Sequence, residues 1–141
     1  MDSVDIKWNG KMSFSTEVDG HEIKMDAKPE VGGEGSGPRP KPLILVALGG
    51  CTGMDIASML TKMRVEFDTL NVKVDGDLTE DHPKHYNQIM ITYELTGKDI
   101  NIEKVKKAVS MSEGKYCGVS HMLKQVAKIS NTIIINGDVI E

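Results

Sequence analysis

The sequence predicts an α+β fold with a mainly antiparallel sheet. Several short segments alternate apolar with polar residues, which is the period of half-buried strands, and others repeat apolar residues at helical spacing. These strands and helices follow one another without regular β-α-β alternation, which favours the α+β class. A chain of 141 residues is the length of one domain and buries roughly two-thirds of its unfolded surface. We therefore expect a single domain over residues 1–141.

The N-terminal quarter is predicted to be an antiparallel β-meander. Val4, Ile6 and Trp8 alternate with polar residues, as in a half-buried strand. Asn9-Gly10 favours a tight hairpin into a second strand over residues 12–18, and Asp19-Gly20 favours another into residues 21–25. Residues 29–42 are rich in glycine and proline, which predicts a mobile loop. Because loops that lead into core helices often line sites, we expect a site-lining role for it.

Residues 43–63 form the strongest predicted helix. The first half is apolar nearly all round, which indicates a buried central helix. Gly49 and Gly50 lie in its interior, where each glycine costs about 0.5–1 kcal/mol relative to alanine. Glycines kept at this cost suggest that another backbone or a ligand approaches the helix closely.

The second half of the chain is predicted to add strands and C-terminal helices. Residues 70–78 and 86–95 alternate as two strands. Asn101 is a suitable N-cap for a helix that ends near Gly114. A further helix is expected to begin close to Cys117, and residues 131–135 form a closing strand that Asn136-Gly137 stops.

Composition excludes several classes of partner. A net charge of −4 and a pI near 5.6 argue against a nucleic-acid surface. The polar, acidic start of the chain does not resemble a secretory signal. The longest apolar run, Leu43 to Leu48, is shorter than the ~20 residues of a membrane span. We therefore expect a cytoplasmic protein without a membrane partner.

Two cysteines, Cys51 and Cys117, stand 66 positions apart. In the cytoplasm such a pair is more often redox-active or metal-binding than a structural disulfide. Cys51 lies in Ala47-Leu48-Gly49-Gly50-Cys51-Thr52, followed by Met54-Asp55-Ile56, and Cys117 lies in Tyr116-Cys117-Gly118-Val119-Ser120. These two contexts resemble the redox cysteines of the OsmC/Ohr family, the osmotically inducible protein C and organic hydroperoxide resistance proteins.

The resemblance implies a fold, an activity and partners. The OsmC-like fold is an intertwined homodimer with the cysteine helices between the sheets. Family members reduce organic hydroperoxides, lipid hydroperoxides among them, in oxidative stress defence, and take electrons from dithiols such as lipoylated proteins. They use no cofactor. By resemblance, Cys51 is the peroxidatic cysteine and Cys117 the resolving one. A pocket for the hydroperoxide is expected around Cys51, lined by Gly49, Gly50, Met54, Asp55 and His121.

The chain departs from the family at the group that activates the thiol. Characterised members supply an arginine from the N-terminal sheet region, held by a glutamate about ten residues before the peroxidatic cysteine. Here the segment Gly37–Pro42 contains no acid, and Arg39 and Arg64 are the only arginines. Arg39 is the best substitute, because it is permanently charged and presents several donors; Lys41 and His121 are alternatives. Asp55, one turn beyond Cys51, is a candidate to orient such a cation.

Two rival interpretations stay open. His82 and His85, beside Asp81, suggest a metal site, but they lie in a turn and no CxxC pair accompanies them. We therefore expect no metal. The other rival is a non-enzymatic dimeric protein that keeps the OsmC-like fold and binds an apolar ligand.

Overall fold

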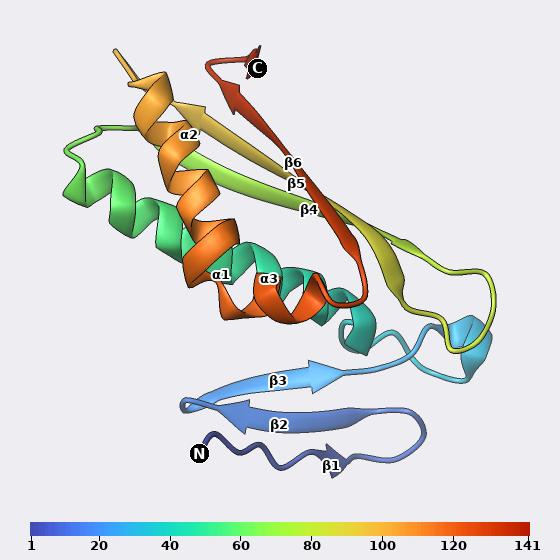
Figure 1. The fold of residues 1–141 in the computed structure, drawn as a ribbon. Helices are drawn as coiled ribbons and strands as arrows, with labels where there is room; N and C mark the ends of the chain where they lie inside the picture. Colours follow the sequence, from blue (N-terminus) through green and yellow to red (C-terminus); the bar gives the residue numbers. More distant parts are fainter. The chain divides into compact units, whose positions relative to one another are not determined.

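The structure is a computed structural model that describes residues Met1–Glu141. Contacts divide the chain into two compact units, Met1–Ile44 and Leu45–Glu141. Strands and helices follow in the predicted order, with one additional C-terminal strand (Figure 1). The α+β class with a mainly antiparallel sheet is confirmed. That residues 1–141 form a single domain stays a prediction.

The first unit begins with the predicted three-stranded antiparallel meander of β1 (Lys7–Trp8), β2 (Phe14–Val18) and β3 (His21–Met25). Asp19 and Gly20 both have positive φ and form the tight turn that pairs Val18 with His21. The predicted tight hairpin at Asn9-Gly10 is wrong. Trp8 pairs with Phe14, so residues 9–13 form a longer connection.

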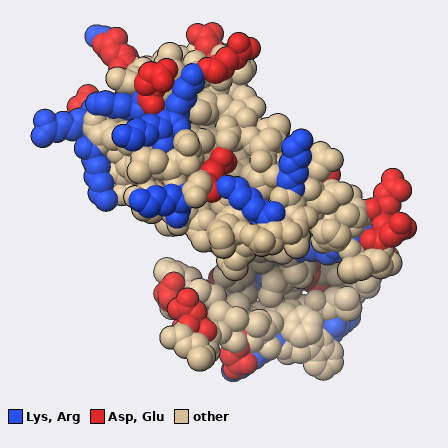
Figure 2. Space-filling view, viewed as in Figure 1, with Lys and Arg blue, Asp and Glu red and all other residues tan.

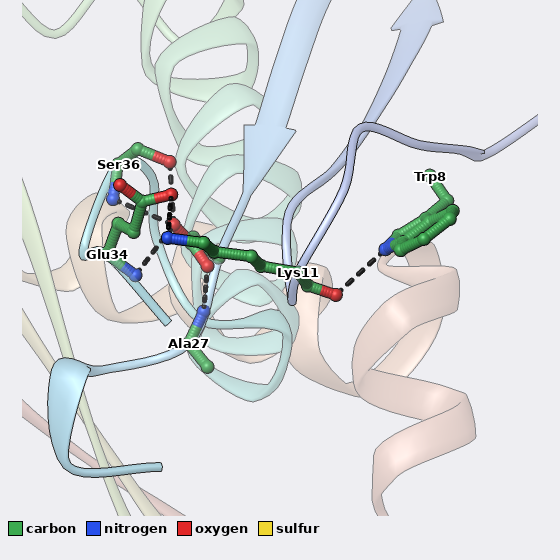
Figure 3. Close-up of polar contacts among 6 residues, drawn as sticks. Trp8, Lys11, Ala27, Glu34 and Ser36 are labelled. Carbon is green, nitrogen blue, oxygen red and sulfur yellow. Dashed lines mark hydrogen bonds and ion pairs between the residues drawn. The ribbon is translucent and has the colours of Figure 1, made fainter. Parts of the chain in front are cut away.

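The glycine-rich loop is ordered around the buried carboxylate of Asp26 (Figure 3). This carboxylate accepts hydrogen bonds from the Ser36 hydroxyl at 2.6 Å and from the backbone N–H groups of Ala27, Glu34 and Ser36. These bonds, led by the one from the Ser36 hydroxyl, lower the pKa of Asp26 to about 2. The loop also contains a short 3₁₀ turn, Pro29–Val31. The loop thus has a defined hydrogen-bonded conformation, and its mobility stays a prediction.

Two glycines of this loop are needed for close backbone approach. A Cβ at Gly33 would lie 2.0 Å from the Ala27 carbonyl oxygen, and one at Gly37 would lie 2.5 Å from that of Lys24. Both contacts are far shorter than real Cβ atoms make. The glycines thus let the loop fold tightly on itself.

The cysteine helix is α1 (Pro40–Lys62), which begins three residues earlier than predicted, since prolines are tolerated in a first helical turn. The prediction of burial nearly all round is wrong for the single chain. Only one face is buried, through Leu48, Thr52, Ile56 and Leu60, whereas Met54 is 76% exposed. By length and composition α1 is long and apolar enough to cross a membrane, a property that core helices share.

The second unit contains a four-stranded sheet in the order β4 (Thr69–Leu78), β5 (Tyr86–Thr96), β6 (Lys128–Ile135) and β7 (Asp138–Ile140). Strands β5 and β6 are parallel and the other neighbours are antiparallel. The strand β7 was not predicted. Asn136 and Gly137 have positive φ and form a turn into β7, whereas the sequence predicted an end there.

The parallel pair requires a crossover, which α2 (Ile102–Met111) and α3 (Gly118–Leu123) supply. The helices of this unit lie on one side of the sheet (Figure 1). Alternate residues of β5 face them and are buried with residues of α1, α2 and β6, including Leu48, Ile56, Leu60, Ile89, Ile91, Tyr93, Leu95, Val105, Ala108, Val109, Ile133 and Ile135. Through this core, α1 is held in place relative to the segment after α2 that carries Cys117.

Glycines also set the contact of α1 with β4. A Cβ at Gly49 would lie 3.0 Å from Val74 Cγ2, and one at Gly53 would lie 3.3 Å from Val72 Cγ2. The close approach predicted at Gly49 is therefore made by side chains of a strand. Gly50 faces open space.

Basic side chains gather over α2 (Figure 2). Lys104, Lys106 and Lys107 contribute to this surface. Lys104 Nζ donates to the Met63 carbonyl at 2.9 Å, and Lys106 Nζ donates to the carbonyl of Glu141. Two of the three lysines therefore bind to backbone oxygens at the surface.

Candidate active site

Cys51 and Cys117 meet in the second unit. Cys51 lies in the middle of α1, and Cys117 is the N-cap residue of α3. The two Sγ atoms and a carboxylate oxygen of Asp55 all lie within 4.8 Å of one another. This is the only such group of three or more His, Cys, Asp or Glu side chains in the chain. The core contacts of α1 thus bring together two thiols that are 66 residues apart in the sequence.

The two thiols differ in exposure and in protonation. Both are free; Cys51 is half-buried and Cys117 is buried, with 3% of its surface exposed. Burial, followed by interaction with the Cys51 side chain, raises the pKa of Cys117 to about 11, against the opposing effect of the Ser120 N–H. That N–H donates to Cys117 Sγ at 3.2 Å. Cys117 is therefore a protonated thiol at neutral pH.

Asp55 lies one helical turn after Cys51, so both side chains point to the same face of α1. The buried hydroxyl of Ser112 donates to Asp55 Oδ2 at 2.9 Å. Asp55 forms no salt bridge; the three ion pairs of the chain lie elsewhere. The carboxylate is thus oriented by a neutral hydroxyl and is not neutralised by a cation of the chain.

A turn of π-helix, Ser112–Tyr116, leads from α2 into Cys117. Its Glu113 accepts hydrogen bonds from Tyr93 Oη at 2.9 Å and from Asn131 Nδ2 at 2.6 Å. Burial and then the Glu113 charge raise the pKa of Tyr93 far above its ordinary value, so Tyr93 stays a neutral donor. Short π-helical turns occur frequently at functional sites. Here the turn fixes the backbone that carries Cys117.

A pocket of 480 Å³ begins beside the cysteines. Asp55 lines it together with residues of α1, the residue after α1, the end of α2 and the π-helical turn: Ser58, Met59, Lys62, Met63, Met111 and Tyr116. Methionine side chains are flexible and polarisable, so such a pocket adapts to apolar groups of varied shape. The pocket shares Asp55 with the cysteine cluster and therefore adjoins it.

The structure places the predicted pocket residues in three ways. Asp55 lines the pocket. Gly49 packs against β4. Gly50, Met54 and His121 are exposed surface positions of the single chain, and the His121 ring forms no hydrogen bond or ion pair.

The predicted cations of the loop belong to the first unit. Arg39 is exposed and directly precedes α1, and Lys41 is exposed in its first turn. Neither side chain forms an ion pair. No cation of the chain is ion-paired with the cysteine and Asp55 cluster.

Sequence reasoning missed the polar residues behind the cysteines, namely Tyr93, Ser112, Glu113 and Asn131. Tyr93 offered the one usable indication, because it lies on the apolar face of a predicted strand and a buried tyrosine hydroxyl needs a partner. Glu113 lies close to the predicted helix end at Gly114, where an acid is expected to be solvated. Nothing in the local sequence pattern predicts the hydrogen bond between Tyr93 and Glu113.

The sequence matches the family described as OsmC-like protein over residues 33–131. The chain belongs to the OsmC-like family. It is 33% identical over 129 residues to Protein YhfA of Escherichia coli strain K12, covering 90% of this chain and 92% of that protein. A solved hypothetical protein from Aquifex aeolicus VF5 is 30% identical with a TM-score of 0.81, covering 96% of this chain and 98% of the other.

OsmC-like proteins of more distant sequence share the fold. An organic hydroperoxide resistance protein OsmC from Legionella pneumophila has a TM-score of 0.70 at 16% identity, covering 95% of this chain and 98% of that one. At this identity the likeness concerns the fold alone. Two free thiols this close together in an OsmC-like protein fit a redox role.

Proposed function

We propose that this protein reduces organic hydroperoxides with electrons from a dithiol. Cys51 is the peroxidatic cysteine and Cys117 the resolving one. The observation that carries the proposal is the contact of two unequally buried free thiols within 4.8 Å. Membership of the OsmC-like family and the name of the Legionella protein support it.

The reaction takes three balanced steps. The Cys51 thiolate attacks the terminal oxygen of ROOH, breaks the O–O bond and becomes a sulfenic acid, and the alkoxide takes a proton and leaves as ROH. The Cys117 thiol then condenses with the sulfenic acid, which forms the disulfide and releases water. A dithiol reduces this disulfide through a mixed disulfide and is itself oxidised to a cyclic or linked disulfide. Oxidative stress defence would be the physiological context.

The unequal surroundings of the thiols favour this order. Cys51 is the more exposed of the two, so a peroxide from solvent reaches it first. Cys117 holds its proton at neutral pH, since burial raises its pKa to about 11, and a protonated thiol is a poor first nucleophile. It is suited to the second step, in which the departing hydroxide takes up the proton.

The methionine-lined pocket suits the organic part of the hydroperoxide. It adjoins the cysteines through Asp55 and offers Met59, Met63 and Met111 to an apolar substituent. Gly49, Gly50, Met54 and His121 stay proposed lining residues of a hydroperoxide pocket around Cys51.

Arg39 remains our candidate for activating Cys51. It carries a permanent charge, is exposed and has no ion-pair partner. Because α1 begins at Pro40, the helical path between the two residues is about 18 Å. An arginine side chain is much shorter than this path, so the contact requires the first turns of α1 to unwind and the segment around Arg39 to fold back.

We also propose a cytoplasmic, intertwined homodimer. The exposed apolar side chains of α1, including Val46 and Met54, support the dimer, because large apolar residues on one helix are covered in most stable proteins. A reducing compartment supports turnover, since it supplies dithiols; a lipoylated protein is our candidate reductant.

The alternative function is a non-enzymatic dimeric protein that binds an apolar ligand. The methionine-lined pocket and the lack of an ion-paired cation at the Asp55 cluster favour it.

Consumption of cumene hydroperoxide with dithiothreitol or dihydrolipoamide tests the proposal. The wild type should consume peroxide and Cys51→Ser should not. Arg39→Ala should be at least about tenfold slower, because a nearby cation shifts thiol ionisation by one or more units. Arg64→Ala, the matched control, should retain the wild-type rate. A wild type that consumes no peroxide with either reductant supports the binding protein instead.

A further inference from the structure

The cysteine cluster combines two thiols, which are soft ligands, with one carboxylate, which is a hard ligand. No cation of the chain forms an ion pair with this carboxylate. Cys51 Sγ, Cys117 Sγ and an Asp55 oxygen lie within 4.8 Å of one another. His82 and His85, the residues that suggested a metal site in the sequence, belong to no such group. We propose that the reduced protein binds one zinc-class divalent cation through Cys51, Cys117 and Asp55.

The distances between the three ligand atoms suit an ion with tetrahedral coordination. Zinc binds thiolate sulfur at about 2.3 Å and carboxylate oxygen at about 2.0–2.2 Å, which places neighbouring ligand atoms roughly 3.5–3.8 Å apart. The atoms here are within 4.8 Å of one another, so no pair needs to close by more than on the order of 1 Å. Side-chain rotation supplies a movement of this size without a change of fold.

Outer contacts already orient two of the three ligands. The Ser112 hydroxyl donates to Asp55 Oδ2 and leaves Oδ1 without a protein donor. The Ser120 N–H donates to Cys117 Sγ, as it would to a thiolate. Hydrogen bonds of this kind fix the direction of metal ligands and raise affinity.

Charge favours an ion of this class. The ligand set carries three negative charges when both thiols are deprotonated, and no Lys, Arg or His forms an ion pair with Asp55. Binding releases the thiol protons to solvent and changes no oxidation state. Three protein ligands leave a fourth position of a tetrahedral ion open to water or to another ligand.

Metal and disulfide exclude each other, because both use the same two sulfur atoms. A bound ion therefore protects the pair from oxidation and stops peroxide reduction until it is removed. This inference goes beyond the proposed function, and its test requires no hydroperoxide.

Isothermal titration calorimetry of the reduced protein with zinc as the only ligand tests the site. We expect one ion per chain in the wild type and none in protein whose cysteines are already joined as a disulfide. Cys51→Ser, Cys117→Ser and Asp55→Asn should each weaken binding at least tenfold. Asp77→Asn, an exposed carboxylate of β4, is the matched control and should bind like the wild type.

Cobalt(II) provides a second readout that shows the ligands directly. Intense sulfur-to-cobalt absorption should appear in the reduced wild type and disappear in the disulfide form, which carries no substitution. Absence of binding to the reduced wild type, or zinc affinity that survives in both serine variants, would overturn the proposal. A protein that binds zinc but consumes no peroxide would contradict the proposed function alone.

Discussion

Cys51 and Cys117 lie close together, yet their surroundings differ. Cys117 is buried among side chains of the core, and the backbone N–H of Ser120 donates a hydrogen bond to its sulfur. Cys51 is half-buried beside a carboxylate that lacks an ion pair. This difference in burial between two chemically identical groups is the basis for the proposed roles of first nucleophile and resolving thiol.

Alkylation of Cys117 in the Cys51→Ser variant tests this difference. Burial is the largest cause of the raised pKa of Cys117 and persists in this variant, whereas the interaction with the Cys51 thiol is removed; only the thiolate reacts. The rate with iodoacetamide should therefore still be rising at pH 9.5. A plateau below pH 9, as in an unfolded peptide, would contradict the assigned burial. By linkage, the folded state holds this proton more tightly, so stability should fall as pH rises above the ordinary thiol pKa of about 8.5.

At the residue scale the sequence predicted the cysteines through their local motifs, and the structure brings them together as expected. The sequence did not predict the structural roles of Asp26 and Glu113 as hydrogen-bond acceptors. Each is a single acid, and apart from the Ala27 N–H beside Asp26 the partners of their carboxylates lie eight or more residues away. Local patterns carry no information about such distant hydrogen bonds.

The π-helical turn Ser112–Tyr116 is the element that positions Cys117. It is anchored by Glu113, whose carboxylate bridges β5 and β6 through Tyr93 and Asn131. Removing the acid leaves the buried tyrosine hydroxyl without its acceptor. The consequence is a measurable loss of stability and a less well-fixed resolving cysteine.

Urea unfolding of Tyr93→Phe, Glu113→Ala and the double variant measures this anchor. Glu113→Ala should destabilise the protein by about 1–3 kcal/mol, because a buried donor loses its partner. The coupling energy between the two changes should be about 0.5–3 kcal/mol. Glu103→Ala, at an exposed position of α2, should change stability by less than about 0.5 kcal/mol. Strictly additive effects would show that the hydrogen bond does not anchor the turn.

Strong periodicity made most elements predictable, and their ends were less so. The strands β4 and β5 agree with the alternating pattern within one residue. The helix α1 begins at Pro40, three residues before its predicted start, because a first helical turn tolerates proline although prolines usually indicate a loop. The turn residues before β7 predict the end of a strand, and the three residues of β7 are too few to show a period.

At the scale of the whole molecule, apolar surface is left exposed in each unit. Trp8 and Phe14 of the meander are exposed, as are Val46 and Met54 of α1. Such residues have a physical explanation if a second chain covers them. The burial of α1 on all sides, which the sequence predicted and the single chain lacks, would then be completed by the partner.

Sedimentation equilibrium at micromolar concentration tests the dimer. We expect twice the chain mass of 15.5 kDa. Met54→Asp should dissociate the dimer, because it buries a charge in the proposed interface. Val139→Asp, at another exposed apolar position, in β7, serves as the control and should remain dimeric. A well-folded monomeric wild type would refute the dimer.

The most direct test of the redox pair is mass spectrometry of the protein after one equivalent of cumene hydroperoxide, under non-reducing conditions. Wild type should lose the mass of two hydrogen atoms and yield a Cys51–Cys117 peptide from a single chain. Cys117→Ser should react once and accumulate sulfenic or sulfinic acid, and Cys51→Ser should not react. If Cys117 alone consumes the first equivalent, the roles are reversed, and a wild type that forms no disulfide contradicts the mechanism.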